Sequence, residues 1–448
     1  MSAASFLRRL LGRPRPDVEA RTQHLVRLCE SLLGERGEVS GAALAREALA
    51  AWQALDERGR TQFFDILAGE FSPPPEAVGK AADAYRDDPT PRNLRRLQEA
   101  AEPARQELFR RLNMAPGGTA LLVDMRSTIQ RGIKAHPDWS AIDADLLHLF
   151  HSWFNRGFLR LERIDWRTSA MVLEKLIQYE AVHAIQGWRD LRRRLESDRR
   201  CFGFFHPQLP DEPLIFIEVA LTRGMSAGVQ PLLQMDAAIA AAGEADCAIF
   251  YSITNCQEGL RGISFGNLLI KQVAEDLKRE FPHLKTFATL SPVPGFRRWL
   301  ASPETRVRLA VGAEGEARRA MLAAIEQPGW HLGDVPEVLQ KNLMRLCAWY
   351  LLHAKQGEEP LDPVARFHLG NGAALERLNW LGDTSDTGMS RSAGMMVNYV
   401  YRLEDVERNH ERYFSSHAVV ASRAIEKLAR KCVLSAPAGM PAGKPADA

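Results

Sequence analysis

Two motifs in the second half of the chain place residues suited to acid–base chemistry beside turns. Ser291 directly follows an apolar run, residues 284–290, that reads as a strand, and Pro292 and Pro294 come after it. Because proline fixes φ, we expect the serine hydroxyl to be held at the end of that strand. His368 precedes a Gly-Asn-Gly sequence and is expected at a turn before an apolar helix. A hydroxyl and an imidazole can donate a hydrogen bond and move a proton, although a packed serine and a structural histidine remain the plain alternative.

A second pattern, upstream of the serine, suits the binding of a phosphate. Residues 245–255 read as an apolar strand, residues 256–266 carry three glycines, and a helix is predicted from Asn267 to Pro282. Glycine lets the backbone approach an anion, and the free N–H groups and dipole of a helix N-terminus favour negative charge. Arg261 could add a charge-assisted contact. The spacing matches neither of the sharp nucleotide-binding motifs, so an ordinary strand-to-helix turn stays open as an alternative.

Other cysteines and histidines give weaker signals. The six cysteines show no CxxC pair and no metal-ligand spacing, which is typical of a reduced intracellular protein. Cys256, inside the glycine loop, could be a nucleophile, but a small buried residue is the commoner case. His148 and His151 lie one helical turn apart without a third ligand nearby, and we interpret them as packing or surface residues. No metal is expected.

Composition bounds the class of protein. The chain has 448 residues, 46% of them hydrophobic and 25% charged, with a formal net charge of +2. The length predicts two or three domains, and the charge gives no reason to expect binding to nucleic acid. No apolar run approaches the ~20 residues that span a bilayer. The first 16 residues are basic but lack the features of a secretory signal, and we interpret them as a solvated terminus.

The pattern of apolar residues predicts an α+β fold. Residues 18–154 read as amphipathic helices throughout, which is typical of an all-α bundle. Residues 158–166 break this pattern as a strand or linker. Helices, two strands around a turn at residues 207–213, and the strand–loop–helix–strand unit follow, which together predict a mixed sheet with packed helices. We therefore expect a helical bundle domain (1–154), a sheet domain (155–433) and a disordered Pro/Gly/Ala-rich tail (434–448).

Five short segments of the sequence together resemble one known family. The segments SPVPGF, FHLGNGA, GLRGISFGNLLIKQV, GMMVNYVY and YEAVHAIQGWRDLRRR resemble the malonyl-CoA decarboxylase family, over roughly residues 153–403. That family couples a helical N-terminal domain to a catalytic domain that resembles the GNAT acetyltransferase superfamily, whose glycine loop binds the pyrophosphate of coenzyme A. The resemblance implies a helical bundle followed by a GNAT-like mixed sheet with packed helices.

The same resemblance implies roles for particular residues. Ser291 and His368 match the catalytic serine and histidine, which also contact substrate, and Tyr401 matches a tyrosine near the site. Lys175 lies where relatives carry a lysine reported to matter. The coenzyme A segment corresponds to Arg261, Gly262, Ile263, Ser264, Phe265, Gly266 and Asn267. Ser264 is a departure, because relatives can have a glutamate there, so a role for that carboxylate does not transfer.

The implied reaction converts malonyl-CoA to acetyl-CoA and CO₂ through a thioester enolate. His368 would protonate the enolate carbon and Ser291 would orient the carboxylate, or these roles are exchanged. No cofactor is expected, because the thioester carbonyl accepts the charge and coenzyme A is part of the substrate. Two alternatives stay open: an acyl-CoA N-acyltransferase of the GNAT type and a non-catalytic acyl-CoA-binding sensor.

Expectations about partners and location complete the hypothesis. We expect malonyl-CoA as the ligand, no nucleic acid or membrane partner, and a homo-oligomer formed through the helical domain. The chain ends in ADA rather than the peroxisomal S-K-L address, so that location does not transfer from relatives, and a cytoplasmic location is expected.

Overall fold

The computed structural model describes residues 16–263, 269–311, 315–432 and 434. These residues form two compact units. The first is made of residues 16–160, 205–214 and 257–263, and the second of residues 161–204, 215–256 and the described residues from 269 onward. The start of the glycine loop, residues 257–263, therefore belongs to the helical unit.

The first unit is built from helices, as the apolar pattern predicts. They are α2 (Pro16–Gly34), α3 (Glu38–Gln53), α4 (Glu57–Gly69), α5 (Pro75–Asp87), α6 (Pro91–Ala101), α7 (Ala104–Asn113), α8 (Gly118–Gly132), α9 (Trp139–Trp153) and the short 3₁₀ helix η1 (Arg156–Phe158). Asp56 caps the start of α4, because its carboxylate accepts the N–H of Gly59. Buried aromatic rings form the core, with Phe64 5.1 Å from Trp52 and 5.0 Å from Trp139.

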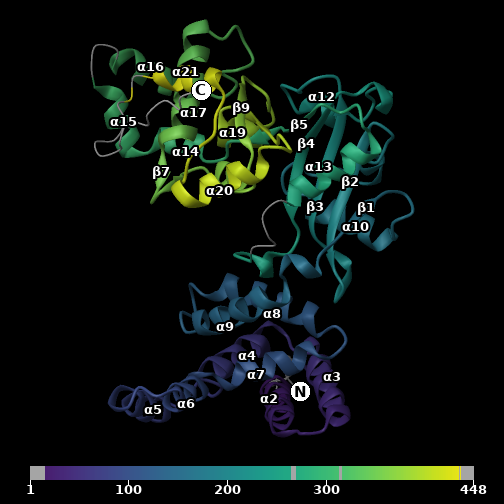
Figure 1. Cartoon of the computed structure of the whole chain (residues 1–448), viewed down its shortest axis with the longest axis vertical. Helices are drawn as coiled ribbons and strands as arrows, with labels where there is room; N and C mark the ends of the chain where they lie inside the picture. Colours follow the sequence, from purple (N-terminus) through teal and green to yellow (C-terminus); the bar gives the residue numbers. More distant parts are fainter. Residues whose placement is uncertain (1–15, 264–268, 312–314, 433, 435–448) are drawn as a thin grey trace, which may run out of the picture. The chain divides into compact units, whose positions relative to one another are not determined.

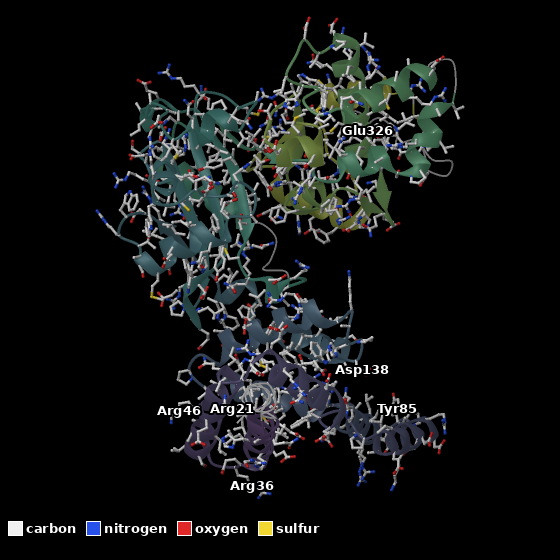
Figure 2. All side chains as sticks on the ribbon, turned by 180° about the vertical axis from the view of Figure 1, so that it is seen from behind. Arg21, Arg36, Arg46, Tyr85, Asp138 and Glu326 are labelled. Atoms are coloured by element: carbon white, nitrogen blue, oxygen red, sulfur yellow. The ribbon has the colours of Figure 1, made fainter. Side chains whose placement is uncertain are left out.

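Helices α5 and α6 form an arm of this unit. Each begins with a proline in its first turn, a position where the missing N–H costs nothing. Neither helix contains a buried residue, and Figure 1 shows the pair running out from the other helices of the unit. Tyr85, labelled in Figure 2, lies on this arm. The arm is thus held mainly by contacts between its own two helices.

The second unit contains a mixed sheet. Its strands are β1 (Arg160–Ile164), β2 (Arg199–His206), β3 (Leu209–Thr222), β4 (Cys247–Asn255), β5 (Thr286–Thr289), β6 (Ser291–Pro292), β9 (Ala374–Asn379) and β10 (Met396–Val400). The order is β1-β2-β3-β4-β5-β10-β6, with β9 also paired to β10. β4 and β5 are parallel, whereas β3–β4 and β5–β10 are antiparallel. A small hairpin, β7 (Lys355–Gln356) and β8 (Glu359–Pro360), stands apart.

Helices pack around this sheet. They are α10 (Ala170–Tyr179), α11 (Trp188–Arg194), α12 (Gln230–Leu233), α13 (Leu269–Glu280), α14 (Phe296–Ala301), α15 (Pro303–Ala310), α16 (Gly315–Glu326), α17 (Glu337–His353), α18 (Pro363–Gly370), α19 (Asp386–Ser392), α20 (Val406–Ser416) and α21 (Arg423–Arg430), with the 3₁₀ turn η2 (Ala242–Glu244). Figure 1 shows α13 alongside β2–β5, and α14–α17 with α21 gathered beyond β9. The expected fold class, a helical N-terminal region followed by a mixed sheet with packed helices, is confirmed.

The parallel pairing of β4 and β5 stops two residues before Ser291. The register runs from Cys247↔Thr286 to Phe250↔Thr289. Beyond this point β4 continues to Asn255, whereas the chain after β5 turns to pair Ser291 with Val397 of β10. The last residues of β4 and the strand that carries Ser291 therefore diverge from one another at the same end of the sheet.

A buried polar network fixes that end of β4. Glu180 accepts the hydroxyls of Ser252 and Thr254 as well as the N–H groups of Val182 and His183. The segment 179–194, which carries part of the family resemblance, thus orients a strand. The free-energy cost of burying these polar groups is offset because each carboxylate oxygen of Glu180 accepts a hydrogen bond.

Several local expectations were wrong. Residues 374–379 form strand β9 rather than an apolar helix, because they pair with β10, and such tertiary pairing overrides local preference. His368 lies in the last turn of helix α18 rather than at the predicted turn, and it is buried. The proline-rich turn is also shorter than predicted, since Pro210 and Pro213 belong to β3.

None of the described helices is both long and apolar enough to cross a membrane.

Candidate active site

Ser291, His368 and Tyr401 form one hydrogen-bonded chain of side chains. Ser291 Oγ lies 2.9 Å from His368 Nε2, and His368 Nδ1 lies 2.9 Å from Tyr401 Oη. All three residues are buried. The structure therefore brings together the serine, histidine and tyrosine that the motifs singled out.

Strand β10 is the element that all three share. Ser291 pairs with Val397 of β10, and Tyr401 follows β10 directly, with its N–H donated to Phe287 O of β5. Tyr399 of β10 stacks on the imidazole of His368, with ring centroids 4.6 Å apart. The ring is thus held on one face by stacking and at both nitrogens by hydrogen bonds.

Thr289 fixes the direction of the hydrogen bonds. Ser291 Oγ–H donates to Thr289 Oγ1 over 2.9 Å, so its only proton is used there. His368 Nε2 must then carry a proton and donate it to Ser291 Oγ, while Nδ1 accepts from the Tyr401 hydroxyl. Thr289 Oγ1 is itself held by the N–H of Tyr399. This tautomer directs an imidazole N–H towards the serine.

Burial keeps both His368 and Tyr401 uncharged. It lowers the pKa of His368 from its usual 6.5 to about 3, with no compensating carboxylate. Burial also raises the pKa of the Tyr401 hydroxyl well above its usual value of 10. At neutral pH the site therefore holds a neutral imidazole and a protonated phenol, that is, donors without a net charge.

Asp362 ties the start of the histidine helix to the turn after the serine. Its carboxylate caps α18 by accepting the N–H groups of Val364 and Ala365, and it accepts the Tyr350 hydroxyl over 3.3 Å. The N–H of Gly295, four residues after the serine, also hydrogen-bonds it, yet burial raises the pKa of this carboxyl above its usual value. A Cβ at Gly295 would lie 2.2 Å from Tyr350 Oη, so only glycine fits there.

The described part of the expected coenzyme A loop is held by helix α8. Arg126 is buried, and its Nη1 donates to the carbonyl oxygens of Gly259 and Arg261 over 2.8 and 2.9 Å. A Cβ at Gly259, within the 3₁₀ turn η3 (Glu258–Leu260), would meet Val123 O at 1.9 Å. Sequence reasoning missed Arg126, because 133 residues separate it from Gly259 and no motif links the two.

Only the first residues of that loop are described. Arg261 is exposed, Gly262 has a φ of +85°, which favours glycine, and Ile263 is buried. Ser264, Phe265, Gly266 and Asn267 lie outside the described residues, and so does the predicted beginning of the helix that the structure describes from Leu269 as α13.

The weaker candidates lie elsewhere. Cys256 is buried, as the plain interpretation expects, and His148 and His151 are exposed on α9. Lys175 is half-buried on α10, which is not one of the elements that carry the serine, histidine and tyrosine. Within the described ranges, no group of three or more His, Cys, Asp or Glu side chains could hold a metal ion.

Comparisons with known proteins agree over most of the chain. The family model "Malonyl-CoA decarboxylase C-terminal domain" matches residues 157–438, and the corresponding N-terminal domain model matches residues 71–154. The mitochondrial malonyl-CoA decarboxylase of Anser anser anser is 36% identical over 353 residues, which cover 74% of this chain and 70% of that protein. The corresponding protein of Rattus norvegicus is 35% identical over 356 residues, with 74% and 72% covered.

Solved structures give the same answer. A crystal structure of malonyl-CoA decarboxylase from Rhodopseudomonas palustris is 51% identical in sequence, covers 91% of this chain and 99% of its own, and has a TM-score of 0.86. The structure from Agrobacterium vitis is 49% identical, with 91% and 99% covered and a TM-score of 0.83. Both domain models match this chain, and the relatives named here align with 74% to 91% of it. The chain therefore belongs to the malonyl-CoA decarboxylase family.

Proposed function

We propose that this protein converts malonyl-CoA to acetyl-CoA and CO₂ at the site formed by Ser291, His368 and Tyr401. The observation that carries the proposal is the 2.9 Å contact between Ser291 Oγ and a neutral His368 Nε2–H in a buried setting. Decarboxylation needs hydrogen-bond donors where charge develops and a proton for the α-carbon, and these side chains are of the right type for both roles.

Loss of CO₂ leaves an enolate whose charge lies mainly on the thioester oxygen. In our proposal this oxygen accepts a hydrogen bond from the site, and the buried surroundings strengthen that bond because little water competes. A neutral imidazole is suited to this role because it donates without binding the carboxylate as tightly as an imidazolium would, so the charged substrate is not stabilised against reaction. Low polarity also favours neutral CO₂ over the carboxylate.

The enolate carbon then takes the proton of His368 Nε2, either directly or by way of the Ser291 hydroxyl. The α-carbon of a thioester is a much weaker acid than either donor, so transfer to carbon is downhill. As the imidazole gives up its Nε2 proton, Nδ1 takes the hydroxyl proton of Tyr401, and the ring stays neutral. The phenolate is reprotonated from solvent at once, because burial strongly favours the protonated phenol. One solvent proton is consumed for each CO₂ released.

Binding of the coenzyme A part is assigned to the glycine loop, from Arg261 to Asn267. Support comes from its described beginning: the positive φ of Gly262 and the rigid hold of Arg126 on two loop carbonyls. The carbonyl groups of Gly259 and Arg261 are thus held in place by Arg126, which lowers the cost of ordering this beginning of the loop when a ligand binds.

The decisive experiment supplies malonyl-CoA alone and follows acetyl-CoA and CO₂. A decarboxylase releases both in equal amounts without an added amine. An acyl-CoA N-acyltransferase would require an amine acceptor, and a sensor would bind the thioester without turnover. Absence of CO₂ release from folded protein that binds malonyl-CoA would contradict the proposal.

Assembly, location and cofactor use belong to the same proposal. We propose a homo-oligomer formed through the helical domain, which light scattering tests, since a mass of one chain would contradict it. We further propose a cytoplasmic location, which fractionation of the source cells tests. The reaction as written needs no added cofactor, because the thioester carbonyl itself accepts the developing charge.

A further inference from the structure

The turn that follows Ser291 contains a single backbone N–H between two prolines. Pro292 and Pro294 have no N–H to donate, so Val293 supplies the only one between them. Val293 is buried, and a buried N–H needs an acceptor. The acceptor is the side chain of Ser392, whose Oγ lies 3.2 Å from the nitrogen of Val293.

This hydrogen bond is important because the strand that carries the serine is short. β6 consists only of Ser291 and Pro292, which pair with β10. A proline cannot donate to the ladder, so a strand of this kind has few hydrogen bonds with which to fix its direction. The bond from Val293 to Ser392 follows directly after the strand and holds the backbone next to Ser291.

A second N–H of the same turn is held by the element that carries the histidine. The N–H of Gly295 hydrogen-bonds Asp362, which caps α18, the helix of His368. The turn is thus fixed at two points, by Asp362 at the start of α18 and by Ser392 at the end of α19. The position of the serine relative to His368 depends on both.

The connection from α19 to β10 places Ser392 over the turn. Ser392 is the last residue of α19 and is buried. Ala393 and Gly394 follow it with φ of +52° and +73°, and they redirect the chain from the helix into β10. A positive φ strains an alanine, and such strain persists only where the surrounding structure enforces it. The N–H of Asp383 donates to Gly394 O over 3.2 Å and closes this connection.

We propose that Ser392 is a positioning residue for the reaction: by accepting the N–H of Val293, it fixes the turn that directs the Ser291 hydroxyl towards His368. Ser392 acts through the backbone and is not itself a catalytic group. A displacement of about 1 Å at a reacting group costs roughly 100-fold in rate, so loss of this hydrogen bond lowers kcat. The inference rests on the proposed function, because Ser291 must take part in turnover.

The test is a double-mutant cycle between Ser392→Ala and Ser291→Ala, measured in the whole protein as CO₂ release from malonyl-CoA. Ser392→Ala removes the acceptor with little change in volume, so kcat falls about 10- to 100-fold while KM changes less than about threefold. In the Ser291→Ala background the same substitution lowers kcat less than about twofold, because no hydroxyl remains to be directed. A purely structural role would give the same loss in both backgrounds.

The matched control is Ser390→Ala, on the same helix. Ser390 is exposed and its hydroxyl donates to Thr387 O, so its loss leaves kcat unchanged. Ser392→Cys is a second variant that keeps a side chain of similar shape but a weaker acceptor. It lowers kcat in the same direction as Ser392→Ala, and it takes the place of the alanine variant in the cycle if that variant does not fold.

Hydrogen exchange of the Val293 amide tests the hydrogen bond without reference to activity. This amide exchanges faster in Ser392→Ala than in the wild type, whereas Ser390→Ala leaves its exchange unchanged.

Equal losses of kcat in the two backgrounds, or a kcat within about twofold of wild type in a folded Ser392 variant, would overturn the inference. Both results leave CO₂ release by the wild type intact. Failure of the proposed function is a different observation, namely no CO₂ release by the wild type itself.

Discussion

Ser291 Oγ and His368 Nε2 lie 2.9 Å apart, although 77 residues separate them in the chain. Strand β10 makes this possible: β6, which begins with the serine, pairs with it on one side, and Tyr399 of the same strand stacks on the imidazole. The pair is thus a product of tertiary structure. Its geometry depends on a few supporting groups, and each of them can be tested separately.

Removal of the hydroxyl that holds His368 Nδ1 tests the proposed proton relay. In Tyr401→Phe the imidazole loses its donor at Nδ1 and the fixed tautomer, so kcat should fall by about 10- to 100-fold while KM for malonyl-CoA changes little. Steady-state kinetics with Tyr85→Phe as a control on the α5–α6 arm measure this. A kcat within twofold of wild type would show that the tyrosine has no part in the reaction.

Arg126 tests whether helix α8 prepares the glycine loop. Arg126→Gln removes two hydrogen bonds to loop carbonyls, and the loop must then be ordered when substrate binds, so KM for malonyl-CoA should rise about tenfold or more with kcat nearly unchanged. Arg105→Gln is a matched control, because Arg105 is equally buried in the same unit but contacts Asp145, Leu67 and Ser72 instead.

If both arginine variants lose similar stability and both keep the wild-type KM, then Arg126 has only a structural role and the idea is wrong.

The neutral state of His368 predicts a specific dependence of stability on pH. Its native pKa is about 3 and its unfolded value about 6.5, so between these values the unfolded chain binds one more proton, and stability falls as the pH falls. From pH 7 to pH 5 the loss amounts to about 2 kcal/mol. Urea unfolding should therefore show the wild type losing about 2 kcal/mol more than His368→Gln over this range.

Other buried groups also titrate here but are common to both proteins. Burial lowers the pKa of His183 to about 4, which acts in the same direction, and raises that of Glu218 to about 8, which acts in the opposite direction. Only the difference between wild type and variant reports on His368, and parallel curves would mean that its imidazole is charged in the native state.

The sequence predicts some residues of this site and not others, for reasons that differ from residue to residue. Ser291 and His368 stand in specific motifs, so both could be named as candidates, although their 2.9 Å contact could not be predicted. The element after His368 was predicted as a helix because residues 374–379 look helical alone and become a strand only by pairing with β10. Arg126 and Thr289 carried no signal, since an arginine in a helix and a threonine in a strand are ordinary until the fold gives them partners.

Cofactor independence is a further prediction. Because the thioester carbonyl accepts the negative charge, dialysis against EDTA should leave kcat for CO₂ release within about twofold of the untreated enzyme. A change of that size corresponds to less than about 0.5 kcal/mol in the activation free energy. Activity is measured before dialysis, after it, and after readdition of divalent cations. A large loss that returns with one cation would require a metal in the mechanism.

The central claim is that Ser291 and His368 act on the same transition state. The direct measurement is kcat for CO₂ release, together with the melting temperature, for Ser291→Ala, His368→Gln and the double variant, with the exposed Ser390→Ala as a control. The account predicts a fall in kcat of roughly 10²–10⁴ for each single variant. The double variant should be little worse than the worse single one, with coenzyme A binding retained. Near-wild-type turnover per folded molecule in His368→Gln, accompanied only by a lower melting temperature, would contradict it.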